Sequence, residues 1–237
     1  GQITINGIGS TLPPGNYLHD YLSWSGTAWI PDSGNNRIHI GENTGLTNQS
    51  DITVAIGQQA AMVNQGVGSI AIGYQAGLQD QGASAIAIGT GAASGGNQGN
   101  ETIAIGIEAG LFNQSSNAIS IGQRAGGNNQ STNAIAVGYF AGRSSQSANS
   151  VAIGFHAGDV SQGSGAIAIG NNAANSNQGI NSIAIGTLAG DNNMPDNSIF
   201  LNATGASQPF PINTTSFAVM PMNTAPVESR VLPPNLP

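Results

Sequence analysis

The sequence predicts an all-β fold, a parallel β-solenoid with 16-residue coils. Three observations predict it: a tetrapeptide of the form Ile-x-Ile-Gly returns along the chain, its glycines recur with a 16-residue period that is broken by a single 17-residue step, and prolines occur only near the two ends. A fixed period of this kind is typical of solenoids, in which each repeat buries its apolar face by stacking on its neighbours. The repeat glycines are Gly41, Gly57, Gly73, Gly89, Gly106, Gly122, Gly138, Gly154, Gly170 and Gly186.

The prolines divide the chain into three parts. All 11 lie at or before Pro31 or at or after Pro195, because the hydrogen-bond ladder inside a stack of strands needs every backbone donor. We therefore expect an N-terminal cap over residues 1–36, a repeat domain of ten to eleven coils over residues 37–202, and a Pro-rich C-terminal extension over residues 203–237.

Each repeat glycine is preceded by two aliphatic residues that flank one other residue. Two such residues share one face of a strand, and β-branched residues favour strands. We expect this face to form the buried core of the solenoid, each side chain contributing about 1.5–3 kcal/mol. An eleventh pair follows one period after the last glycine. The aliphatic pairs are Ile38 and Ile40, Val54 and Ile56, Ile70 and Ile72, Ile86 and Ile88, Ile103 and Ile105, Ile119 and Ile121, Ile135 and Val137, Val151 and Ile153, Ile167 and Ile169, Ile183 and Ile185, and Ile199 and Leu201.

The residue between the two aliphatic residues points to the opposite face of the strand and is small in almost every repeat. Small side chains indicate a closely packed surface, most simply identical chains around a symmetry axis. We therefore expect an obligate parallel homotrimer of about 71 kDa, three times the 23.7 kDa chain, with a solvent-facing sheet as the alternative. These positions, here called the small-residue column, are His39, Ala55, Ala71, Ala87, Ala104, Ser120, Ala136, Ala152, Ala168, Ala184 and Phe200.

The column is bulky only at its two ends. If it faces a threefold axis, Phe200 from three chains would form an apolar plug at one end. At the other end, three His39 rings would form a cluster able to hold an anion or a metal ion. The alternative is that His39 merely covers the first coil beneath Trp24 or Trp29, which lie in a hairpin predicted around Ser25-Gly26.

A glutamine recurs eight residues after nearly every repeat glycine. In stacked coils these side chains would lie about 4.8 Å apart, so that each amide could bond the next. We expect a structural ladder that ends where Met194 takes the place of glutamine. The glutamines are Gln49, Gln65, Gln81, Gln98, Gln114, Gln130, Gln146, Gln162 and Gln178.

Composition excludes several classes of partner. Only 6% of residues are charged and the formal net charge is -7, whereas about a quarter of residues are charged in ordinary globular proteins. The only cations are four arginines, too few for the phosphate contacts that nucleic acids or anionic membrane surfaces require. No apolar run approaches the roughly 20 residues of a membrane span, and the absence of cysteine excludes disulfides. We expect no nucleic-acid partner and no membrane insertion.

The sequence also argues against catalysis. The acidic residues are scattered without a recurring pair, and His19, His39 and His156 have no metal-ligand spacing. We therefore expect no enzyme activity, no catalytic residue and no cofactor.

Variable positions directly after the repeat glycines carry aromatic and cationic residues in the later coils. Rigid aromatic side chains with arginines on an exposed rim are typical of receptor or glycan binding, although contacts between neighbouring chains would use the same residue types. The candidate ligand-binding residues are Arg124, Tyr139, Phe140, Arg143, Phe155 and His156.

The repeat unit, as in Asn181-Ser182-Ile183-Ala184-Ile185-Gly186 with Ala189, resembles the head repeat of YadA-like trimeric autotransporter adhesins. The resemblance covers the chain from Arg37 to Asn202. It implies a left-handed parallel β-roll, with three chains side by side around one axis.

The closing segment from Asn197 to Gly205, which reads N-S-I-F-L-N-A-T-G, resembles a narrower group. Similar closures follow such repeats in surface and fibre-like proteins of giant DNA viruses and in phage tail fibres. The resemblance implies an extracellular protein on a virion surface that attaches to a host through a cell-surface receptor or glycan. The alternatives are a structural spacer or virion-decorating protein without a ligand, and an adhesin head on a bacterial cell surface.

Overall fold

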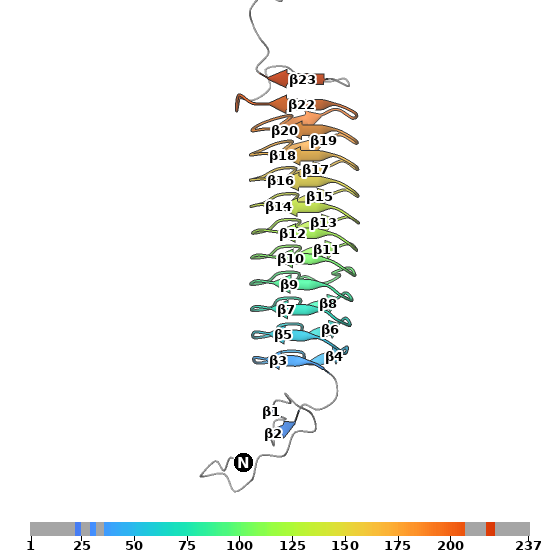
Figure 1. Cartoon of the computed structure of the whole chain (residues 1–237), viewed down its shortest axis with the longest axis vertical. Coiled ribbons are helices and arrows are strands. Elements are labelled where there is room, and N and C mark those ends of the chain that lie inside the picture. Colours follow the sequence, from blue (N-terminus) through green and yellow to red (C-terminus); the bar gives the residue numbers. More distant parts are fainter. Residues whose placement is uncertain (1–21, 25–28, 32–35, 207–216, 221–237) are drawn as a thin grey trace, which may run out of the picture.

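The computed structural model describes residues 22–24, 29–31, 36–206 and 217–220. In these residues the chain folds into a stack of β-coils that forms a straight rod (Figure 1). Strands of successive coils pair in parallel at the predicted repeat spacing, which confirms the parallel β-solenoid. The described part of the chain contains no helix, and so none that is long and apolar enough to cross a membrane.

One wall of the rod is a 12-stranded sheet that carries the aliphatic pairs and the small-residue column. Equivalent residues stack in register from coil to coil, so that Ala104 pairs with Ser120 and Ile105 with Ile121. The strands of this sheet are β3 (Ile38–Ile40), β5 (Val54–Ile56), β7 (Ile70–Ile72), β9 (Ile86–Ile88), β10 (Ile103–Ile105), β12 (Ile119–Ile121), β14 (Ile135–Val137), β16 (Val151–Ile153), β18 (Ile167–Ile169), β20 (Ile183–Ile185), β22 (Ile199–Asn202) and β23 (Phe217–Met220).

The second wall consists of two sheets, one of three strands and one of six. They are separated at the coil with the longer step, where Gln98 makes isolated bridges to Gln81 and Gln114. The strands are β4 (Thr47–Gln49), β6 (Val63–Gln65) and β8 (Gln79–Gln81) in the first sheet, and β11 (Phe112–Gln114), β13 (Asn128–Gln130), β15 (Ser144–Gln146), β17 (Val160–Gln162), β19 (Ser176–Gln178) and β21 (Asn192–Met194) in the second.

Two further elements lie outside the repeat. Strands β1 (Leu22–Trp24) and β2 (Trp29–Pro31) pair antiparallel, as the predicted hairpin requires, and its turn lies outside the described residues. At the other end, β23 pairs in parallel with β22. The large sheet therefore continues by one strand into the segment that the sequence predicts to be an extension without repeats.

The small-residue column lies inside the coil of a single chain, so the expectation that it faces a symmetry axis is wrong. Every member from Ala55 to Phe200 is fully buried within one chain. Ser120 shows that the column points into the coil. Its Oγ donates to Oε1 of the buried Gln130 at 2.7 Å and accepts from Nε2 of the buried Gln114 at 3.2 Å. The column therefore packs against the chain's own interior, and the expected contact between chains cannot involve it.

The physical reason is the thinness of the coil. The turn opposite the large sheet brings alanines and glycines directly against the column, and a Cβ added to Gly110 would lie 3.2 Å from Cβ of Ala104. Interiors are packed too densely to admit branched side chains into so small a gap. Alternation along a strand separates its two faces, but the space inside the coil decides which of them is buried.

The aliphatic pairs consequently face outward, and the expectation that they form the core is wrong. None of them is buried; Ile40 is 57% exposed, and Ile121 and Ile153 are each 38% exposed. Because the strands stack in register, the pairs form two continuous apolar rows along the outside of the rod. We call these rows, made of the eleven pairs from Ile38 and Ile40 to Ile199 and Leu201, the aliphatic ladders.

The predicted glutamine ladder is confirmed from Gln98 to Gln178. Each Nε2 in this run donates to Oε1 of the glutamine one coil further on, at 3.0 to 3.5 Å. The glutamines of the earlier coils instead donate to backbone carbonyls, as Gln65 does to Val54 at 3.1 Å. These buried amides tie the two walls of each coil together.

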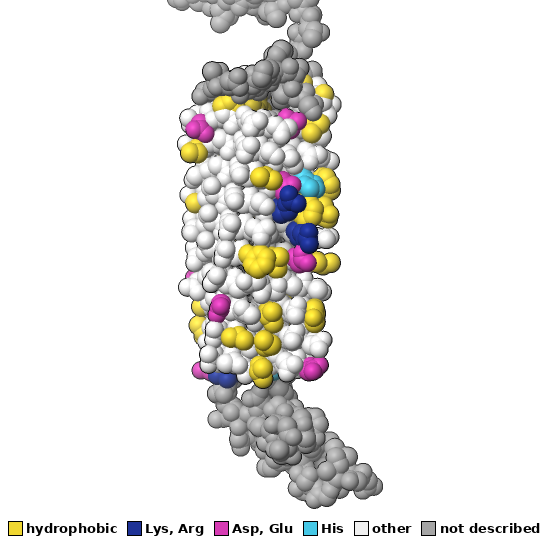
Figure 2. All heavy atoms as spheres, turned by 180° about the vertical axis from the view of Figure 1, so that it is seen from behind, with side chains coloured by type: hydrophobic (Ala, Val, Ile, Leu, Met, Phe, Trp, Pro, Cys, Tyr) yellow, Lys and Arg dark blue, Asp and Glu magenta, His cyan; other side chains and the backbone are white. Residues whose placement is uncertain are grey.

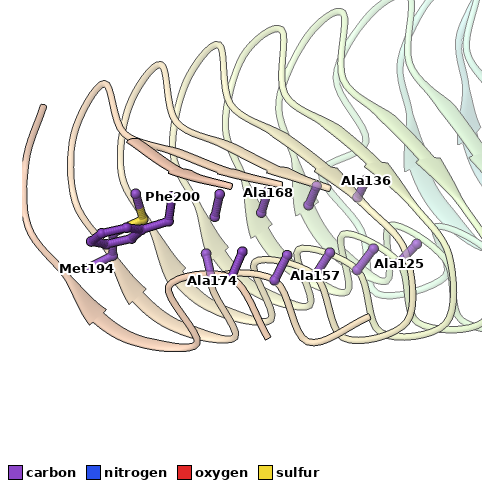
Figure 3. Packing of buried hydrophobic residues seen from close by; sticks show 12 residues of the cluster. Ala125, Ala136, Ala157, Ala168, Ala174, Met194 and Phe200 are labelled. Carbon is purple, nitrogen blue, oxygen red and sulfur yellow. The ribbon is translucent and has the colours of Figure 1, made fainter. Parts of the chain in front are cut away.

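The C-terminal end of the interior is filled by Met194 and Phe200, which replace glutamine and alanine in the last coil (Figure 3). A Cβ on Gly190 would lie 2.7 Å from Sδ of Met194 and 3.0 Å from Cδ2 of Phe200. One Phe200 ring thus plugs its own coil, and the expected plug of three rings on an axis is wrong.

At the N-terminal end, the His39 ring packs against Gly45 of its own chain, where a Cβ would lie 2.8 Å from Cε1. The expected cluster of three His39 rings on an axis is wrong for the same reason as the Phe200 plug. Within the described ranges, no group of three or more His, Asp or Glu side chains is placed to hold a metal ion.

Asn202 closes the stack where a repeat glycine would stand. Its Nδ2 donates to the carbonyls of Thr187 and Ala206, both at 2.7 Å, and its Oδ1 accepts from the backbone N and the Oγ1 of Thr204. The N-A-T-G sequence therefore encodes a terminating turn.

Candidate functional site

The turn that follows each strand of the large sheet carries the variable positions of the repeat. Arg124 follows β12, Tyr139 and Phe140 follow β14, and Phe155 and His156 follow β16, so they project from one edge of the rod in three successive coils. Figure 2 shows arginine (dark blue), acidic (magenta) and histidine (cyan) side chains gathered at this edge beside hydrophobic ones. The rest of the visible surface is mostly neutral and polar.

The second residue of this turn adopts the left-handed backbone region, with φ of 55° at Arg124, 56° at Phe140 and 51° at His156. Asparagine and glycine enter this region most easily. Other coils adopt the same conformation at this position with Gln59, Gln75, Glu108 and Leu188 as well as with Asn172 and Gly91. A bulky residue in this conformation costs about 1–3 kcal/mol. The fold therefore requires this backbone conformation in every coil, but none of these particular side chains.

The aromatic side chains of the two later coils form one continuous cluster. Tyr139 and Phe155 stack with their centroids 5.3 Å apart and their planes 7° from parallel. Phe140 contacts Tyr139 at 4.2 Å, and His156 meets Phe140 and Phe155 edge-on at 5.0 and 4.4 Å. Tyr139 remains 40% exposed and Phe155 48% exposed, so the cluster presents apolar surface to solvent.

Both arginines lie over the ring of Phe140. The Cζ atom of Arg143 is 4.9 Å from the ring centroid and that of Arg124 is 5.7 Å from it, within range of cation–π attraction. The cluster and the arginines therefore form one unit, and the structure brings together all six residues that the sequence singles out.

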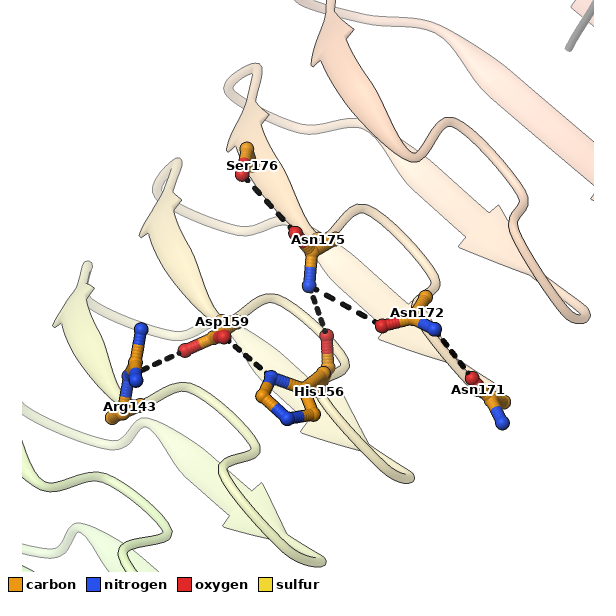
Figure 4. Close-up of polar contacts among 7 residues, drawn as sticks. All are labelled: Arg143, His156, Asp159, Asn171, Asn172, Asn175 and Ser176. Carbon is orange, nitrogen blue, oxygen red and sulfur yellow. Dashed lines mark hydrogen bonds and ion pairs between the residues drawn. The ribbon is translucent and has the colours of Figure 1, made fainter. Parts of the chain in front are cut away.

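Asp159 ties Arg143 to His156 (Figure 4). Its Oδ2 lies 2.6 Å from Nδ1 of His156 and its Oδ1 lies 2.8 Å from Nε of Arg143. The contact with Arg143 is an ion pair without the alignment of a hydrogen bond. Asn175 donates to the carbonyl of His156 at 3.3 Å. Because Asp159 is almost completely buried, these contacts fix the orientation of Arg143 and His156, whose side chains are half-buried.

Glu108 fixes the orientation of the Arg124 side chain in the same way. Nε of Arg124 donates to Oε2 of Glu108 at 2.5 Å across one coil. This hydrogen bond, together with the negative charge of Glu108, raises the pKa of Arg124 above its usual value. Arg124 is therefore a permanent cation held in one place on the exposed edge.

A groove of about 320 Å³ runs beside this unit. It is lined by Glu108, Leu111, Phe112, Arg124, Gly127, Asn128, Arg143 and Ser144. Its centre is Gly127, whose position in the coil is occupied by Leu111 one coil earlier and by Arg143 one coil later. The missing side chain thus leaves a recess between two side chains of its own column.

Sequence reasoning missed several residues of this region, among them Glu108, Phe112, Gly127 and Asp159. A signal for the two acids was present, because Glu108 stands one repeat period before Arg124 and Asp159 stands one repeat period after Arg143. Side chains one period apart stack in a solenoid, so opposite charges at this spacing predict ion pairs. The groove had a weaker signal, a glycine at a position that carries leucine and arginine in the neighbouring coils.

Comparisons of the chain with protein-family models, with curated proteins and with solved structures gave no match.

Proposed function

We propose that this chain is a non-enzymatic, trimeric surface fibre or head protein that attaches to a host cell or surface. Its place would be extracellular, on a virion surface, with a bacterial cell surface as the alternative. Three copies of a left-handed β-roll would stand in parallel, and each would present the aromatic and arginine residues described above to a protein or glycan.

The aliphatic ladders support the assembly. They form apolar rows along the whole described stack, and a contiguous apolar surface of this kind is typical of an interface. A flat row of isoleucines in register is self-complementary, and identical chains in parallel would bury it along the full length of the rod. This surface replaces the small-residue column as the proposed contact between chains.

The observation that carries the attachment role is the exposed aromatic and arginine cluster. Its members lie outside the coil interior, and buried or half-buried acids hold the arginines in place. Aromatic residues and arginine supply most of the binding energy in protein interfaces. Three copies on one rigid rod would multiply a weak affinity by avidity.

The experiment replaces Tyr139 by Gln and Phe155 by Asn, the residues found at the same position of the coil in Gln123 and Asn171. We expect the double variant to keep the mass of the unmodified protein and to lose at least tenfold in apparent affinity for host cells. Light scattering and binding of the labelled full chain to cells measure the two quantities. The matched control is Tyr74→Gln, which removes an exposed aromatic side chain from the same position of an earlier coil.

Three other outcomes would each contradict a different part of the proposal. Unchanged cell binding by the double variant would exclude this cluster as the attachment site. A loss of mass would instead make the cluster a contact between chains. Failure of the unmodified chain to bind any cell or glycan would favour a structural spacer without a ligand.

A further inference from the structure

We propose that the groove at Gly127 binds a single carboxylate-bearing sugar unit, an inference that rests on the attachment role and names its ligand class. The groove lies directly beside the aromatic cluster and shares Arg124 and Arg143 with it. A glycan chain that leaves the groove could therefore continue over the exposed rings of Tyr139 and Phe155.

The size of the groove fits one ring-sized group. Its volume of about 320 Å³ lies at the lower end of the range of ligand pockets, roughly 300–1,000 Å³. Leu111 and Arg143 wall it along the column of Gly127, and Phe112 forms a further wall. The ring of Phe112 packs onto Gly95, where no Cβ would fit, so this wall is fixed while the side chain stays 43% exposed.

The two guanidinium groups are arranged to receive an anion. Each pairs with its acid through Nε, Arg124 with Glu108 and Arg143 with Asp159. These two pairs leave the Nη amino groups of both arginines for another partner, and two Nη groups can bind a carboxylate end-on through a pair of hydrogen bonds. Phe140 lies under both groups, so little ordering would be needed on binding.

The charged groups around the groove favour an anion with a single negative charge. Two of the four arginines of a chain with net charge -7 line this groove. Against them stand two carboxylates, Glu108 in the lining and Asp159 paired with Arg143, so these four groups together carry no net charge. A ligand with one negative charge would meet less repulsion from these two carboxylates than a doubly charged phosphate would. The geometry therefore favours a monocarboxylate.

The remaining lining groups favour a sugar over an acidic peptide. The carboxylate of Glu108 and the amide oxygen of Asn128 can accept hydrogen bonds from hydroxyl groups, and the hydroxyl of Ser144 can donate one. The exposed face of Phe112 can pack against the C–H face of a sugar ring. A sugar presents several hydroxyl donors around one ring, whereas an acidic peptide offers these acceptors only its backbone N–H groups.

The test titrates the full-length protein with D-glucuronic acid and with D-glucose, which carries a hydroxymethyl group in place of the carboxylate. Ligand-observed NMR detects the binding of either. We expect glucuronic acid to bind at least tenfold more tightly than glucose. We expect Arg124→Gln and Arg143→Gln each to weaken its binding at least tenfold, since each removes a charge-assisted contact.

The matched control is Arg37→Gln, which removes a cation that pairs with Asp51 far from the groove, and it should leave binding unchanged. Gly127→Leu should abolish binding by filling the recess with the side chain that Leu111 carries one coil earlier. If Gly127→Leu does not fold, as judged by circular dichroism, the two arginine variants decide the question.

Equal binding of glucose and glucuronic acid would overturn the proposal, as would equal losses in Arg37→Gln and the groove variants. Tighter binding of a triglutamate peptide than of glucuronic acid would replace the sugar by an acidic peptide. The attachment role is judged separately: host-cell binding that survives Arg124→Gln and Arg143→Gln would remove the sugar site and leave attachment standing. Absence of cell binding by the unmodified protein would remove attachment itself.

Discussion

Replacing Ala104 by leucine is expected to destabilise the rod severely, by about 3 kcal/mol or more, because it overpacks the interior. Ala104 is fully buried, and the opposite turn approaches it so closely that a Cβ on Gly110 would already lie 3.2 Å away. The buried glutamine amides that join the two walls leave the coil little freedom to widen. Unfolding by guanidinium, followed by circular dichroism, measures the effect.

The matched control is Ile105→Leu, which changes the next residue of the same strand on its outer face and should alter the unfolding free energy by less than about 1 kcal/mol. If Ala104→Leu kept full stability but lost its oligomeric state, the small-residue column would face another chain after all. The assignment of the aliphatic ladders to the outside would then be wrong.

The second large effect concerns the aliphatic ladders. Lysines in place of Ile121 and Ile153, both partly exposed on the outer face of the large sheet, should reduce the mass in solution from about 71 kDa to that of the 23.7 kDa chain. Six like charges would otherwise be buried among apolar side chains without partners. The circular dichroism spectrum should remain that of a β protein, because the coil interior is untouched.

Lysines in place of Ser145 and Ser161 form the control pair, since both serines are exposed on the second wall of the rod, one coil apart. This pair should leave the mass unchanged. Dissociation by the control pair to the same extent would show that charge anywhere on the rod, and not charge on the ladders, separates the chains.

Much of the fold follows from the sequence because every coil of a solenoid carries the same pattern of residues. The spacing of the repeat glycines predicts the coil length, and the glutamines one period apart predict a buried ladder that the structure confirms from Gln98 to Gln178. The assignment of faces failed at Ala104 and Ile105. A short coil cannot enclose isoleucine, and hydrophobicity alone does not report the width of an interior.

The candidate site was predictable to a similar degree. Side chains at equivalent positions of neighbouring coils must lie together, so the grouping of Tyr139 with Phe155 follows from their separation by one repeat period. The cross-coil pairing of Glu108 with Arg124 follows the same rule. The recess at Gly127 shows in the sequence only as a glycine between Leu111 and Arg143, one period away on either side. Its walls depend on side-chain conformations, which the repeat spacing does not predict.

The mass of the unmodified chain in solution, measured by light scattering, tests the central claim most directly. The proposed fibre requires three chains that bury their aliphatic ladders against one another, and predicts about 71 kDa, three times 23.7 kDa, without dependence on concentration over the micromolar range. A stable monomer of 23.7 kDa would mean that the ladders face water, and would contradict the account of this protein as a trimeric attachment rod.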